Sequence, residues 1–184
     1  SGPADSYVML VAPFDSRFRQ TKLQKTVYSY GAGDDAYGVA SILELLSQSL
    51  KYRDKWSQGV RILFTDSEEN ALDGMKCAAE YNPELFEKVG FVVNLESRGM
   101  NGPALLFETS VNNEKVLDLY SLAKAPYGYS LTTVVYRFLP NNTDFTVVKD
   151  SIPGLNFSTI DNINYYHVDD DNFDNINLST IQHY

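Results

Sequence analysis

Short apolar runs of strand length alternate along this chain with segments whose apolar residues recur at helical spacing. The first run, Tyr7–Ala12, is continuous and apolar, as is typical of a strand in a parallel sheet covered on both faces. A later segment places Val39, Ile42 and Leu46 three to four residues apart, as on one face of a helix. This alternation predicts an α/β fold, a three-layer αβα sandwich with a mixed, largely parallel central sheet.

The remaining segments extend the same pattern. Further strands are predicted at 60–65, 89–96, 102–110 and 152–158. Helices are predicted from about Asp34–Asp35 onward, at 72–81 and at 112–124. The segment 143–150 is ambiguous, residues 14–33 are polar and contain glycine, and 161–177 is typical of a loop rich in Asp and Asn. With 184 residues and 43% hydrophobic content, we expect a single domain over 1–184.

The composition excludes several classes of partner. The chain has 24 acidic and 15 basic residues, a formal net charge of −9, and no cluster of Lys and Arg that could follow a phosphate backbone. Nucleic acid is therefore not an expected partner. No apolar stretch approaches the ~20 residues of a membrane span, so we expect no membrane contact from this domain itself. The single cysteine, Cys77, excludes an intrachain disulfide framework and is expected to pack in the core.

Acidic residues follow or end three of the predicted strands. Asp15 follows the first strand, Glu68 and Glu69 follow the second, and Glu96 ends the third. The carboxyl ends of parallel strands meet at the same edge of an α/β sheet, where ligands bind. Like charges brought so close require a cation, a proton or hydrogen bonds to compensate them. The sequence therefore places a candidate ligand site at this edge.

Asp34 and His167 are expected at the same edge. Carboxylates together with an imidazole form a ligand set that suits Zn²⁺. A bridging carboxylate can hold two such ions about 3.5–4 Å apart. One or two zinc ions are thus the predicted cofactor.

Five segments carry a resemblance to a known family. They are GAGDDAYGVASILELL (31–46), LFTDSEEN (63–70), NLESRG (94–99), NTDFTVVKDSIPGLNFS (142–158) and YYHVDDDNFDN (165–175). In this order they resemble the motifs of the M28 family of zinc aminopeptidases, in particular the branch whose peptidase domains are attached to membrane proteins. The resemblance implies the zinc-exopeptidase fold, peptide substrates and an extracytoplasmic or membrane-attached location. It also implies that part of the family's N-terminal region is missing.

The resemblance further implies a role for each site residue. Asp34 would bridge two metal ions, Glu69 and His167 would complete one metal site, and Glu96 would bind the other ion. Glu68 would be the general base that takes a proton from a zinc-bound water. The implied activity is removal of single residues from peptide N-termini.

One residue departs from the family pattern. Where the family has Val-Ala-His-Tyr-Asp-Ser, this chain has VAPFDS (11–16), so Pro13 replaces a histidine ligand of the ion shared by Asp34 and Glu96. Three outcomes are open: a weak two-metal peptidase, a one-zinc site like that of the related glutaminyl cyclases, or a binding domain without catalysis. The longer segment 17–30 reshapes the rim of the site and adds weight to the second and third outcomes.

Several candidate residues also have ordinary structural interpretations. Asp35 is the expected N-cap of the first helix, which leaves Asp34 as the ligand. Asp15 would orient the histidine that Pro13 replaces, and in the absence of that histidine both a supporting role next to the site and no role are open. Asp144 and Asp171 match family positions near the pocket, but a turn or a helix cap would explain them equally well.

Overall fold

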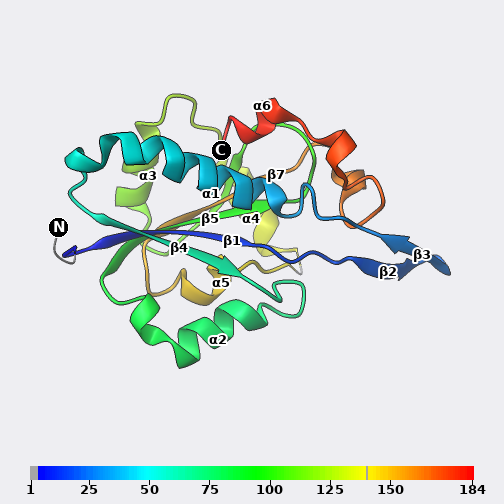
Figure 1. The fold of residues 1–184 in the computed structure, drawn as a ribbon, viewed down its shortest axis with the longest axis horizontal. Helices are drawn as coiled ribbons and strands as arrows, with labels where there is room; N and C mark the ends of the chain where they lie inside the picture. Colours follow the sequence, from blue (N-terminus) through cyan, green and yellow to red (C-terminus); the bar gives the residue numbers. More distant parts are fainter. Residues whose placement is uncertain (1–3, 140) are drawn as a thin grey trace.

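Five strands form one sheet in the computed structural model, which describes residues 4–139 and 141–184 (Figure 1). The strand order is β4 (Gly59–Thr65), β1 (Tyr7–Pro13), β5 (Val89–Ser97), β7 (Gly154–Thr159) and β6 (Leu105–Thr109). Strand β1 pairs in parallel with β4 and β5, and β5 pairs in parallel with β7. Only β6, at one edge, is antiparallel to its neighbour among the strands of this sheet. The predicted mixed, largely parallel sheet is confirmed.

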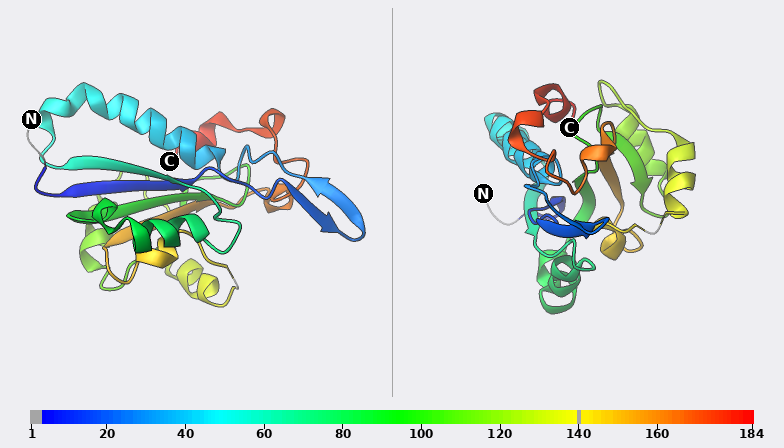
Figure 2. Two further views of the ribbon diagram at one scale, coloured as in Figure 1. Left: turned by 60° about the horizontal axis from the view of Figure 1, so that its bottom comes forward. Right: turned by 90° about the vertical axis from the view of Figure 1, so that its right-hand side faces the viewer.

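Helices cover both faces of the sheet (Figure 2). Successive side chains of β1 point to opposite faces, and since this strand is apolar, both faces carry apolar side chains that the helices bury. Leu10 packs in a cluster with Ile42 of α1 (Ala36–Ser49). Met9, on the other face, packs with Met75 of α2 (Asp73–Tyr81) and Phe145 of α5 (Phe145–Val148). The three-layer αβα sandwich predicted from the sequence is therefore present.

The β6 edge of the sheet carries two more helices. Val116 of α3 (Glu114–Ser121) packs with Leu106 and Leu155. Tyr136 of α4 (Ser130–Arg137) contacts Phe107 edge-on, with ring centres 4.7 Å apart. Helix α4 was not predicted, and α5 lies in the segment that the sequence left ambiguous. Short elements fill the remaining segments: η1 (Leu50–Lys55), η2 (Pro83–Leu85), η3 (Ile163–Tyr165), η4 (Phe173–Asn175) and α6 (Leu178–Ile181).

A two-stranded hairpin extends from the carboxyl-end side of the sheet (Figure 1). It consists of β2 (Arg19–Lys22) paired in antiparallel register with β3 (Lys25–Tyr28). Its two turn residues, Leu23 and Gln24, have φ angles of 48° and 65°. Hairpin turns of this kind usually carry Asn or Gly at such positions, so Leu23 and Gln24 did not indicate a turn in the sequence. The polar segment after β1 is thus a hairpin as well as a loop.

Two further outcomes concern the surface. Cys77 lies on α2 as expected, but the prediction that it packs in the core is wrong, because it sits on the exposed side of that helix. Among the helices of residues 4–139 and 141–184, none combines the length and apolar character needed to cross a membrane.

Candidate active site

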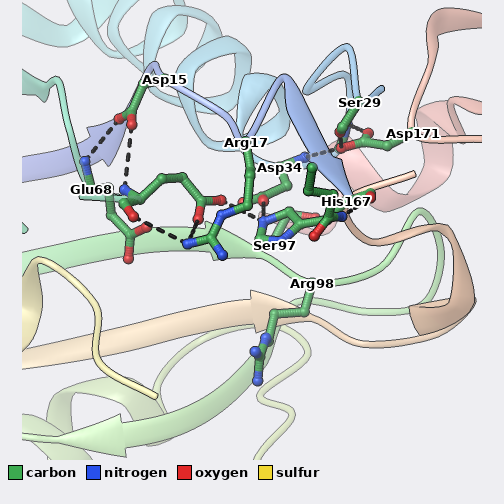
Figure 3. Close-up of polar contacts among 12 residues, drawn as sticks. Asp15, Arg17, Ser29, Asp34, Glu68, Ser97, Arg98, His167 and Asp171 are labelled. Carbon is green, nitrogen blue, oxygen red and sulfur yellow. Dashed lines mark hydrogen bonds and ion pairs between the residues drawn. The ribbon is translucent and has the colours of Figure 1, made fainter. Parts of the chain in front are cut away.

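Asp34, Glu69 and His167 meet at the carboxyl ends of the parallel strands. His167 Nε2 lies 2.9 Å from Asp34 Oδ2 and also contacts Glu69 Oε1. One potential ligand atom from each residue lies within 4.8 Å of the other two. Figure 3 shows Asp34 and His167 directed toward one another, although they come from opposite ends of the sequence. We call these three residues the metal triad.

Asp34 reaches the site because its neighbour caps the helix. The side chain of Asp35 accepts a hydrogen bond of 3.1 Å from the backbone N–H of Gly38 at the start of α1. This is the N-cap role predicted for Asp35. Asp34, one residue earlier, does not cap the helix, and its carboxylate lies with Glu69 and His167 in the triad.

Asp171 holds the loop that carries Asp34. Its carboxylate accepts hydrogen bonds from the Ser29 hydroxyl at 3.1 Å and from the backbone N–H groups of Gly33 and Asp34 at 2.5 and 3.4 Å. Its side chain is almost completely buried. The structure thus gives Asp171 a supporting position next to a triad residue, and it is not part of the triad's ligand set.

Asp15 holds the pair of glutamates that follows β4. Its carboxylate accepts hydrogen bonds from the backbone N–H groups of Glu68 at 3.0 Å and Glu69 at 3.3 Å (Figure 3). Of the two possibilities left open for Asp15, a supporting role or none, these hydrogen bonds favour a supporting role. Asp15 sets the position of the turn that carries Glu68 and Glu69.

The charges of the triad compensate one another. Burial raises the pKa of Asp34 to about 7, and the nearby charge of Glu69 adds to this rise, while the hydrogen bond from His167 opposes it. Burial disfavours the charged form of His167, but the hydrogen bonds and charges of Asp34 and Glu69 outweigh it and raise the His167 pKa to about 9. Burial acts against the ionised form of Glu69 as well, yet its contacts with His167 and Arg17 lower its pKa. The contacts with His167 therefore favour the charged forms of Asp34 and Glu69, which is the effect that a bound cation would also have.

Glu68 lies beside the triad and lines the same cavity. Burial, together with the charges of Glu69 and Asp34, raises its pKa to about 8. Its side chain is outside the triad's ligand set. Glu68 therefore lies beside the triad and faces the same cavity, and its role as a general base stays a prediction.

Glu96 and Pro13 occupy the positions at which the family resemblance implies ligands of a second metal ion. Glu96 lines the cavity, but it is outside the triad, and its Oε1 accepts a hydrogen bond of 3.0 Å from Asn94. Burial and the nearby charge of Glu68 raise its pKa well above the usual range. Pro13, buried at the end of β1, has no side-chain donor atom. Within the described residues, Asp34, Glu69 and His167 form the group of side chains whose ligand atoms lie close enough together to hold a metal ion.

Asp144 is buried next to β4. One carboxylate oxygen accepts a hydrogen bond from the Thr65 hydroxyl, and the other has no partner in the described part of the chain. Although Asp144 precedes α5, its side chain makes no capping hydrogen bond there. The helix-cap interpretation of Asp144 is therefore wrong.

The cavity has a volume of about 660 Å³, and its lining includes Arg17, Arg98 and Tyr136, which the sequence analysis did not single out. Arg17 Nη2 lies 2.9 Å from Glu69 Oε2 (Figure 3). The Tyr136 hydroxyl is buried and has no hydrogen-bond partner in the described part of the chain. Arg98 lies two residues after Glu96. Arg98 belongs to the quoted segment 94–99, but nothing in that segment marked it as a cavity residue, and Arg17 and Tyr136 lie outside the five segments. The positions of the three side chains depend on the segment before the hairpin, on α4 and on contacts between loops.

Relatives of known sequence match this chain over most of its length. The mouse protein "Endoplasmic reticulum metallopeptidase 1" is 30% identical over 184 residues, which is 97% of this chain and 19% of the mouse protein. A "Vacuolar membrane protease" of Paracoccidioides lutzii is 31% identical over 158 residues, covering 84% of this chain and 16% of the fungal protein. The chain thus spans less than a fifth of these relatives, one of which is a membrane protein by name.

Solved structures match the fold. The Legionella pneumophila aminopeptidase LapA superposes with a TM-score of 0.71 at 20% identity, covering 97% of this chain and 48% of LapA. An aminopeptidase from Aneurinibacillus sp. strain AM-1 gives a TM-score of 0.64 at 20% identity, covering 97% and 41% of the two chains. The family model described as peptidase family M28 matches residues 1–184. The chain therefore belongs to peptidase family M28.

Proposed function

We propose that this chain is a metal-dependent aminopeptidase domain that works with a single zinc ion. The observation that carries the proposal is the triad of Asp34, Glu69 and His167, whose ligand atoms lie within 4.8 Å of one another beside a cavity. Membership of family M28 and the aminopeptidases of the same fold support it. The proposal of a single ion rests on Pro13, which offers no donor atom where the family has a histidine ligand.

Each residue has a distinct task in the proposed reaction. The triad would hold the ion through two carboxylates and one imidazole nitrogen. A bound zinc ion would supply a Lewis acid that polarises the scissile carbonyl and makes water more acidic. Glu68 would accept the proton that the attacking water loses and pass it to the leaving amine. The buried Tyr136 hydroxyl could donate a hydrogen bond to the substrate's carbonyl oxygen.

An acidic group of the cavity favours a substrate with a free amino terminus. Glu96 lines the cavity outside the triad and could receive an N-terminal ammonium group. A free ammonium group would gain charge-assisted hydrogen bonds there that an acetylated N-terminus cannot make. This is why we propose an aminopeptidase rather than a peptidase that cuts within chains.

The test is hydrolysis of amino-acid anilides by the zinc-loaded chain, with and without chelator. Glu68→Gln should lower kcat by about 100-fold or more while zinc stays bound, because general-base catalysis contributes about that much. Glu80→Gln, an exposed residue of α2, is the matched control and should have no effect. Hydrolysis that survives chelation or Glu68→Gln would contradict the proposal.

Two alternative functions remain as distinct outcomes of the same assay. A zinc-binding chain that releases no amino acid from any substrate would be a binding domain. A chain that acts only on N-terminal glutamine, with loss of ammonia, would be a cyclase. Cleavage of N-acetylated peptides at the same rate as free peptides would contradict the aminopeptidase proposal itself.

A further inference from the structure

Arg98 is a half-buried cation in the wall of the cavity beside the metal triad. Its backbone N–H donates a hydrogen bond of 3.0 Å to the Thr159 carbonyl, which fixes the residue at the carboxyl ends of β5 and β7. Within the described ranges 4–139 and 141–184, no carboxylate lies within 4.0 Å of its guanidinium. A partly desolvated charge without a counter-ion costs free energy, so a bound anion would be favoured there.

Neutral groups hold the Arg98 guanidinium in place. Its Nη2 donates a hydrogen bond of 3.1 Å to Asn141 Oδ1, and its Cζ lies 4.9 Å from the ring centre of Tyr166. The Tyr166 ring stacks in turn on His167, with ring centres 3.6 Å apart and an interplanar angle of 21°. These contacts orient Arg98 without neutralising it. A guanidinium has five N–H donors, so several stay available to a ligand.

The other cations of the cavity are placed differently. Arg17 forms an ion pair of 2.9 Å with Glu69, so its charge is already balanced within the site. Lys76 is exposed, and water can solvate its ammonium group. In Figure 3, no dashed line joins Arg98 to the other residues drawn, and it lies apart from the cluster around Arg17. The lining also includes four carboxylates: Asp34, Glu68, Glu69 and Glu96. An anionic group would therefore be repelled by these carboxylates and attracted by Arg98.

We infer that Arg98 binds a carboxylate of the peptide substrate, which makes the site selective for short peptides with a free C-terminus. The inference rests on the proposed aminopeptidase function. Arginine pairs with carboxylates through two parallel hydrogen bonds. Two stacking contacts separate Arg98 from His167 of the triad. Because consecutive Cα atoms are about 3.8 Å apart, a C-terminal carboxylate one or two residues beyond the scissile bond can span that separation.

The test compares peptides that differ only in their carboxylates. The substrates are leucyl-alanine, leucyl-alanine amide and leucyl-aspartate amide, hydrolysed by the zinc-loaded wild-type chain and by Arg98→Gln. We expect kcat/KM for leucyl-alanine to fall about tenfold or more in the variant, chiefly through KM. For leucyl-alanine amide, kcat/KM of the variant should stay within about twofold of the wild-type value, since this substrate has no carboxylate that Arg98 could bind. Arg53→Gln, an exposed residue of η1, is the control.

The third substrate identifies the source of the carboxylate. A loss confined to leucyl-aspartate amide would assign Arg98 to an acidic side chain instead of the C-terminus, and would overturn the selectivity for a free C-terminus. Equal losses for all three substrates, or no loss, would show that Arg98 does not bind a carboxylate.

A binding measurement separates this inference from the proposed function. Calorimetric titration of leucyl-alanine and its amide into the Glu68→Gln chain, and into that chain with Arg98→Gln added, needs no turnover. A preference for the free acid that disappears with Arg98→Gln supports the carboxylate site even if the chain hydrolyses nothing. Hydrolysis of peptides without any such preference would support the function and overturn the inference.

Discussion

The carboxylate of Asp15 accepts a 3.0 Å hydrogen bond from the backbone N–H of Glu68, and so links the end of β1 to the turn after β4. A second bond of 3.3 Å comes from Glu69. Asp15→Ala would leave both N–H groups without this acceptor. We expect the free energy of unfolding to fall by about 1–3 kcal/mol and zinc affinity to fall with it, because Glu69 loses its fixed position. Urea denaturation and zinc titration measure the two effects.

Asp15→Asn is the informative companion variant. Its amide oxygen can still accept one of the two hydrogen bonds, so zinc affinity should lie between those of the wild type and Asp15→Ala. Zinc binding by Asp15→Ala as tight as that of the wild type would show that Asp15 does not position Glu69.

The two histidines of the chain differ in their expected contribution to metal binding. His167 belongs to the triad, whereas His183 Nδ1 accepts a hydrogen bond of 3.1 Å from the Ala104 backbone. Loss of a residue that only orients a metal ligand costs about 10–100-fold in affinity, so loss of a ligand should cost at least about 100-fold. We therefore expect His167→Ala to lose zinc at micromolar concentrations, and His183→Ala to keep one ion per chain. Mass spectrometry after dialysis counts the ions.

Asp144 predicts a dependence of stability on pH in the metal-free chain. Burial raises its pKa in the folded state to about 6 from an ordinary value of 3.8, against the opposing hydrogen bond from Thr65. The folded state therefore binds this proton more tightly than the unfolded state, and stability falls as pH rises from about 4 to about 6. Asp144→Asn removes the ionisation and can keep the Thr65 hydrogen bond.

This variant should be more stable than the wild type at pH 7.5, by on the order of 2 kcal/mol, and should show no gain near pH 4. Denaturation with chelator at the two pH values measures the difference. The control variant Asp150→Asn, at an exposed position, should have the stability of the wild type at both pH values. A gain of the same size at both pH values would mean that the effect of Asp144→Asn does not come from ionisation.

The sequence predicted those parts of the molecule that depend on local patterns. Each predicted strand overlaps a strand of the sheet, because continuous apolar runs mark buried parallel strands. Glu68 and Glu69 follow the end of β4, so they lie at the carboxyl edge of the sheet, as the sequence predicted. The positions of Arg17 and Arg98 could not be predicted, since they depend on a hairpin with an unusual turn and on the stack formed by Tyr166. Side-chain contacts between distant loops leave no periodic signal in a sequence.

Pro13→His should restore the histidine ligand that the family pattern has at this position and that this chain lacks. Position 13 is buried at the end of β1, in register with Thr65, and Asp34 and Glu96 line the neighbouring cavity. An imidazole there would add a nitrogen donor for a second ion, and a cation would favour the ionised form of Glu96, whose pKa burial raises. We expect the variant to bind two zinc ions per chain and the wild type one, with a higher rate of anilide hydrolysis. Pro13→Ala removes the proline without adding a donor, so it should bind one ion. If Pro13→His also binds one ion, or binds two without a gain in rate, then the loss of this histidine does not limit the activity of the chain.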